Sequence, residues 1–265
     1  MFKRLFIYLL CTSAFWGMSI EEDKNSTITK VDLSFKKITD TAFLSFFPSV
    51  IDLNLDVASL PASDLAPLLV LRNLRNLSIR NLKYDSLLPL KKLPNLQSLS
   101  LSSKTMEVDC EILKNMPNLE SLILTCPHKD LPLISVLTQL KKLKLSGVLN
   151  GLSHSGEALS INFLSSLVLL KELDLSENEY LFFIKPISNL PSLKRLYLGG
   201  SHNIHDIVSL TAAKSLEKLN IQGLSVSKEE ITTLMNIPTL KKLTLSYAGE
   251  IKNVPELLTI KQKKH

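Results

Sequence analysis

The sequence has few of the residues on which small disulfide-rich or metal-bound domains depend. It contains three cysteines (Cys11, Cys110 and Cys126), eight glycines and one tryptophan, and aromatic residues make up only 6% of the chain. No C-x-x-C pair and no cysteine–histidine cluster is present, so the spacing predicts no zinc site. A Cys110–Cys126 disulfide would require an oxidising compartment, and we expect the two residues to lie on different sides of the fold.

Motifs for catalysis are also missing. The chain has no phosphate-binding G-x-x-x-x-G-K-[ST], no G-x-G-x-x-G and no H-E-x-x-H pattern. His202 and His205 are close enough in sequence to share a metal ion, but they fall in an ordinary turn between repeated segments, so we do not assign them as ligands. We therefore expect no enzymatic activity, no cofactor and no small-molecule substrate.

The N-terminal residues are apolar after a short basic start. Lys3 and Arg4 precede a mostly apolar stretch over residues 5–18, which ends in small residues suited to cleavage. This layout predicts a signal peptide over residues 1–19, and an uncleaved membrane anchor is the alternative. Residues 20–27 would then form a lead-in, and the mature protein would be secreted, periplasmic or bound to the cell surface.

A leucine pattern recurs along the rest of the chain. The pattern L-x-x-L-x-L occurs ten times, with its last apolar positions at residues 33, 55, 79, 101, 124, 145, 175, 198, 221 and 245. Alternating leucines place one apolar face on a short strand, and such a strand cannot bury that face alone. Stacked copies would form a parallel sheet, and the intervening segments would return along its outer side.

The pattern resembles that of leucine-rich repeat proteins, and its short spacing and L-P-x-L lead resemble the bacterial internalin-type and related short-repeat classes of 22–24 residues. The resemblance implies an α/β solenoid. This is a curved horseshoe with a parallel concave β-sheet of about ten short strands and irregular or short helical convex segments. The repeats would occupy residues 28–249, and residues 250–265 would form a C-terminal cap and basic tail.

Two features depart from the regular pattern. The family usually has asparagine three residues after the last strand leucine, and here only Asn178 fits, whereas Ser201 is one of several substitutes for it. The spacing between Leu145 and Leu175 is 30 residues. The additional residues are either a longer convex segment, with a helical turn near residues 161–169, or a protruding loop that contacts a partner.

Residues beside the framework leucines are expected to point into the concave side. We select as candidate partner-binding residues the long polar side chains of the later repeats: Lys142, Lys144, Glu172, Asp174, Arg195, Tyr197, Lys218 and Lys242. Arginine and tyrosine anchor protein interfaces more often than other residues, so Arg195 and Tyr197 rank first. The alternative is that the lysines only keep the protein soluble.

These features predict a non-enzymatic protein-binding module, secreted or exported, that recognises a macromolecular partner mainly through the concave face. One alternative is an intracellular enzyme inhibitor or adaptor, and another is polyanion binding by the basic C-terminal half. The net charge of +6 is small and no block of five like charges occurs, so nucleic acid is not the expected partner. A membrane contact is expected only if the N-terminal segment is uncleaved.

Overall fold

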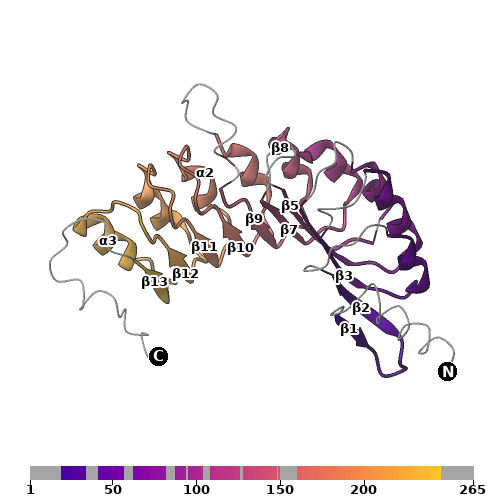
Figure 1. Cartoon of the computed structure of the whole chain (residues 1–265). Coiled ribbons are helices and arrows are strands. Elements are labelled where there is room, and N and C mark those ends of the chain that lie inside the picture. Colours follow the sequence, from indigo (N-terminus) through magenta and orange to yellow (C-terminus); the bar gives the residue numbers. More distant parts are fainter. Residues whose placement is uncertain are drawn as a thin grey trace.

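The computed structural model describes residues 19–33, 41–56, 62–81, 87–93, 95–103, 108–125, 128–147, 149 and 160–245. Within them, one open sheet has eleven strands in the order β1-β2-β3-β4-β5-β7-β9-β10-β11-β12-β13. Figure 1 shows these strands following one another along the inner side of a curved coil, with the helical segments on the outer side. The predicted curved solenoid with a parallel concave sheet is therefore confirmed.

Ten of the strands are parallel and correspond to the ten copies of the leucine pattern. They are β2 (Ile28–Leu33), β3 (Asp52–Asp56), β4 (Asn76–Arg80), β5 (Ser98–Ser102), β7 (Ser121–Thr125), β9 (Lys142–Lys144), β10 (Glu172–Asp174), β11 (Arg195–Tyr197), β12 (Lys218–Asn220) and β13 (Lys242–Thr244). The register is constant from coil to coil: Leu173 of β10 pairs with Leu143 on one side and Leu196 on the other. Each framework leucine therefore stacks on its counterpart, and so does each residue beside it.

The eleventh strand was not predicted. β1 (Ser19–Glu22) pairs antiparallel with β2, so that Ile20 lies opposite Val31 and packs against the core. Residues 20–27 were expected to be a lead-in, and their first residues form most of β1. A single short strand carries no repeat signal, yet it pairs with the backbone of β2, which would otherwise lie at the edge of the sheet.

The outer side of the coil is built mainly from short 3₁₀ helices. They are η1 (Ala42–Phe46), η2 (Ala62–Val70), η3 (Leu88–Lys92), η4 (Cys110–Asn115), η5 (Leu131–Val136), η7 (Asn162–Ser166) and η8 (Ile207–Ala212). Among the described residues, the outer side also includes the α-helices α2 (Lys185–Ser188) and α3 (Lys228–Met235) and a small parallel sheet of β6 (Val108–Asp109) and β8 (His128–Lys129). The predicted helical turn near residues 161–169 corresponds to η7.

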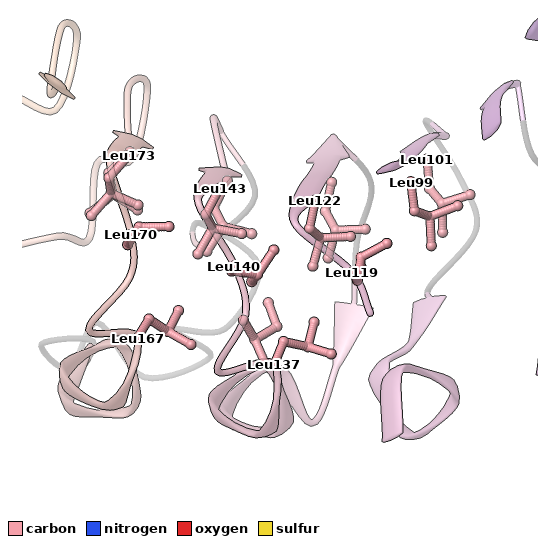
Figure 2. Packing of buried hydrophobic residues seen from close by; sticks show 14 of the residues in the cluster. Leu99, Leu101, Leu119, Leu122, Leu137, Leu140, Leu143, Leu167, Leu170 and Leu173 are labelled. Atoms are coloured by element: carbon pink, nitrogen blue, oxygen red, sulfur yellow. The ribbon is translucent and has the colours of Figure 1, made fainter. Parts of the chain in front are cut away.

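The core is a continuous column of leucine side chains between the sheet and the outer segments. Figure 2 shows this stacking in neighbouring coils, where Leu122, Leu143 and Leu173 come from the strands and Leu137 and Leu167 from the outer side. These five leucines are at most 1% exposed. Burial of one such side chain contributes about 1.5–3 kcal/mol, which is offset largely by the loss of chain entropy.

Several predictions concern residues outside the described ranges. These are the signal peptide apart from Ser19, the C-terminal cap and tail at 250–265, and most of the long spacing between residues 148 and 159. Cys110 is buried at the start of η4, but Cys126 lies outside the described residues, so the predicted separation of the two cysteines stays a prediction. In the part of the chain that is described, no helix is long and apolar enough to span a membrane.

Candidate binding surface on the concave sheet

The eight candidate residues lie together on the five strands β9–β13. The constant register arranges the concave side chains of these strands in two rows. The first row is Lys142, Glu172, Arg195, Lys218 and Lys242, and the second row is Lys144, Asp174, Tyr197, Asn220 and Thr244. Neighbouring members of a row belong to strands about 4.8 Å apart, so their side chains can interact directly. We call these ten residues the basic end of the concave face.

Glu172 lies between two cations of the first row. Its Oε1 is 2.9 Å from Lys142 Nζ and its Oε2 is 2.7 Å from Arg195 Nε, and its side chain is only 17% exposed. Partial burial acts to raise the pKa of Glu172, but the hydrogen bonds from Lys142 and Arg195 outweigh it and hold that pKa below its usual value. Arg195, the first choice of the sequence analysis, is therefore engaged within the chain.

The second row contains a similar pair. Lys144 Nζ is 2.9 Å from Asp174 Oδ2, and Asp174 Oδ1 accepts a hydrogen bond from the backbone N–H of Ser176 at 3.0 Å. Both carboxylates of the basic end are thus compensated by side chains of neighbouring strands. The sequence placed these residues on one face but did not reveal the ion pairs, because the pairing depends on the side-chain conformation within each row.

Lys218 and Lys242 differ from the other cations of the first row. They are Cα partners on β12 and β13, both side chains are exposed, and neither forms an ion pair with an acidic residue of the described chain. The half-buried Tyr197 lies beside Asn220 in the second row and its hydroxyl has no hydrogen bond within the same described ranges. Within the described residues, these three side chains have no polar side-chain partner and can be contacted by another molecule.

The concave face changes character along the coil. On β2–β4 the rows carry Asp32 and Asp52 against a single Lys30, and amide side chains of the next coil donate to both aspartates. On β5 and β7 the rows contain no charge and consist of Ser98, Ser100, Ser121 and Ile123. The basic end has five cations against two carboxylates, so the face runs from weakly acidic through neutral to basic.

A second set of ion pairs lies at the rim, one residue before the first row. Glu217 is 2.9 Å from both Lys194 and Lys241, and hydrogen bonds from these two lysines lower the pKa of Glu217 from its usual 4.5 to about 2. Glu120 and Lys141 form another pair at 2.7 Å. Sequence reasoning did not identify this row, although a charged residue immediately follows the first leucine in each of the last six copies and could have indicated it.

The two histidines considered as ligands have separate contacts. His202 Nδ1 is 2.7 Å from the carbonyl oxygen of Gly223, whereas the ring of His205 stacks on Phe182 at a centroid distance of 5.7 Å. No group of three or more histidine, cysteine or carboxylate side chains suited to a metal ion occurs in the described ranges.

Asn178 forms the network that the sequence pattern implied. Its side chain is fully buried; Nδ2 donates to the carbonyls of Leu145 and Leu175, and Oδ1 accepts from the N–H of Leu149. Ser201, also fully buried, occupies the same place one coil later. This backbone network stabilises the turns immediately after the strands that carry the basic end.

The geometry of the coil agrees with solved structures. Internalin C2 from Listeria monocytogenes matches with a TM-score of 0.54 at 19% sequence identity, over 83% of this chain and 81% of that one. A leucine-rich repeat protein from Leptospira interrogans matches with a TM-score of 0.53 at 20% identity, over 82% of this chain and 67% of that one. The chain has the leucine-rich repeat fold. The predicted resemblance to internalin-type leucine-rich repeats is confirmed at the level of the fold.

A plant protein shows the same leucine-rich repeat architecture. The ectodomain of the Arabidopsis receptor kinase HAESA, in complex with an N-terminally extended IDA peptide hormone, matches with a TM-score of 0.55 at 19% identity. The match covers 90% of this chain and 38% of that one, so this leucine-rich repeat chain spans well under half of the receptor ectodomain. No protein-family model and no curated protein matches the sequence.

Proposed function

We propose that this leucine-rich repeat chain is a non-enzymatic, secreted or exported protein-binding module that recognises its partner mainly through the concave face. The observation that carries the proposal is the basic end. There, five adjacent strands present two registered rows of polar side chains on one continuous surface. The repeat pattern predicts a ten-strand strip of about 650 Å², near the roughly 800 Å² that each partner contributes to a standard protein interface.

The ion pairs of the basic end support binding because they fix long side chains before a partner arrives. Glu172 holds Lys142 and Arg195, and Asp174 holds Lys144, so fewer rotamers are lost when a partner covers them. Immobilising one flexible side chain at an interface costs about 0.5–1.5 kcal/mol. Surface lysines kept for solubility alone would not require carboxylates at matching positions on the neighbouring strand.

The two carboxylates of the basic end make polyanion binding unfavourable. Glu172 and Asp174 lie on β10, the second of the five strands, where they would repel a phosphate or sulfate chain laid across β9–β13. An intracellular inhibitor or adaptor would use the same face, and only the location of the protein separates it from an exported one. N-terminal sequencing of protein recovered from cells and from their medium decides this point: an exported protein is expected to start near residue 20, whereas an intracellular one would retain Met1.

The binding face is tested by photo-cross-linking from defined positions. In the full chain, Tyr197 on the concave face is replaced by p-benzoylphenylalanine, and the matched control carries the same group at Phe46, which is 52% exposed on η1. Protein adducts of discrete mass from Tyr197 but not from Phe46 are expected on exposure to candidate partners. Adducts from Phe46 alone would place the binding surface on the outer side and overturn the proposal.

A further inference from the structure

We propose that the partner segment bound over β11–β13 is an acidic, extended protein segment, with a carboxylate held jointly by Lys218 and Lys242. This inference rests on the proposed binding function and specifies the chemistry of its partner. It follows from a comparison of three pairs of cations within the chain itself. Two of these pairs already hold a carboxylate, and the third does not.

The two filled pairs show what the spacing of the coils can accommodate. Glu172 in the first row bridges Lys142 and Arg195 at 2.9 and 2.7 Å. Glu217 at the rim bridges Lys194 and Lys241, both at 2.9 Å. In each case one carboxylate on the middle strand uses its two oxygens to satisfy cations on the strands to either side.

The third pair has a different geometry. Lys218 and Lys242 are Cα partners on adjacent strands, so no middle strand lies between them to supply a carboxylate. The other neighbour of Lys218 in the first row is Arg195, and no acidic residue of the described ranges pairs with either lysine. Like charges directly opposite one another on neighbouring strands destabilise a sheet. A carboxylate from outside would reduce this repulsion and would meet two exposed ammonium groups that have no acidic partner within the described residues.

The distribution of charge along the concave face also indicates where an acidic partner segment would bind. An acidic segment is repelled by Asp32 and Asp52 at the first coils and attracted by the basic end, and the uncharged serines of β5 and β7 separate the two regions. The partner's acidic residues are therefore expected over β11–β13. A second copy of this chain cannot supply them from its own concave face, because two concave surfaces do not fit into each other.

Tyr197 adds a specific contact next to the lysines. It lies in the second row on β11, one strand before Lys218, and its ring is half-buried among neighbouring coils. Successive same-side residues of an extended segment are about 6.8 Å apart. A segment with one carboxylate over Lys218 and Lys242 can therefore bring a following side chain or carbonyl group to the Tyr197 hydroxyl.

The test is a selection from a random display library of twelve-residue peptides against the immobilised full chain. Three proteins are compared: the parent, the double variant Lys218→Glu/Lys242→Glu, and the matched control Lys91→Glu/Lys228→Glu, which makes the same charge change at exposed positions of η3 and α3. Thermal melting followed by circular dichroism verifies that all three are folded. A second variant, Lys218→Gln/Lys242→Gln, repeats the comparison without introducing negative charge.

The parent and the control are expected to select peptides enriched in aspartate and glutamate, and both lysine variants are expected to lose this enrichment. A selected peptide should bind the glutamine variant at least about tenfold more weakly than the parent. The inference is overturned if the selected peptides are not acidic, if no peptide is selected, or if enrichment survives in the folded lysine variants. It is also overturned if heparin binds through Lys218 and Lys242 while acidic peptides do not. Cross-linking from Tyr197 would still report separately whether the concave face binds protein.

Discussion

The hydroxyl group of Ser201 accepts a hydrogen bond from the backbone N–H of Asn178 at 3.1 Å and donates one to the carbonyl oxygen of Leu175 at 2.8 Å. A serine of one coil thus satisfies two backbone groups of the preceding coil. Asn178 does the same for the coil before it, through Leu145 and Leu149. The irregular position that the sequence left unexplained is therefore filled by a shorter side chain with a related role.

We expect Asn178→Ala to lower the free energy of unfolding by about 2–4 kcal/mol and Ser201→Ala by about 1–3 kcal/mol. Each change leaves buried backbone groups without a partner, and the cost of one such group is about 1–3 kcal/mol. Urea denaturation followed by circular dichroism measures both values. Asn203→Ala, which removes only an exposed bond to Glu179, is the control and should cost much less. Equal losses at positions 178 and 203 would contradict the role assigned to burial.

We expect Glu177→Gly and Gly147→Ala to change stability in opposite directions. Both residues lie two positions after the last strand leucine and have a left-handed backbone, with φ of 61° and 70°. Only glycine adopts this conformation without strain, so Glu177→Gly should raise the free energy of unfolding by about 0.5–1 kcal/mol. Gly147→Ala should lower it by about 1 kcal/mol, since the new Cβ has no neighbour nearer than 3.8 Å and adds only conformational strain.

We expect charge reversal at two adjacent positions of the first row to have opposite effects. Arg195→Glu places two carboxylates on neighbouring strands, beside Glu172, and should destabilise the fold by about 1–2 kcal/mol. Lys218→Glu instead places a carboxylate between Arg195 and Lys242, and should be neutral or stabilising by up to about 1 kcal/mol. Melting temperatures of the two variants at low and high salt provide the test. A loss of stability in Lys218→Glu would show that its neighbours are arranged differently.

We expect the stabilisation due to Glu172 to disappear in acid. The pKa of Glu172 in the folded chain lies below the usual 4.5, so the unfolded chain takes up the proton first as the pH falls. The contribution is complete above about pH 4.5 and is lost as the pH drops through the lower pKa of the folded state. Glu172→Gln should therefore cost about 1–2 kcal/mol at pH 7 and distinctly less at pH 3. Chemical denaturation at the two pH values measures the difference, and a constant cost would contradict the ion-pair origin.

The repeat architecture could be predicted because each copy repeats the same apolar positions. Leu143, Leu173 and Leu196 occupy the same place in their copies of the pattern, and stacking brings these equivalent places into register. The strand β1 could not be predicted, since its role depends on the edge of β2 and not on a pattern within Ser19–Glu22. The repeat pattern therefore predicts the stacked strands that neighbouring coils have in common, but not the strand that covers the edge of the first coil.

The sequence predicted which candidate residues lie on the concave face, but not which of them form ion pairs with one another. The alternation of apolar and polar residues places both Arg195 and Lys218 on the concave face. In the structure, Arg195 forms an ion pair with Glu172, whereas Lys218 is exposed. The difference arises because the strand on one side of Arg195 carries a carboxylate at the same register position, whereas neither neighbour of Lys218 does. That information lies in the comparison of residues 23 or 24 positions apart, once the coil length is known.

The short strand β1 has a consequence for how molecules of this chain meet in concentrated solution. The outer edge of a sheet offers unpaired N–H and C=O groups on which a foreign strand can template aggregation. β1 is only four residues long, and it ends in Glu21 and Glu22, of which Glu21 is held by Lys30 at 2.5 Å. A second copy that paired its own β1 with this edge would bring the same two carboxylates toward Glu21 and Glu22. The first coil is thereby protected against edge-to-edge pairing with the first coil of another copy.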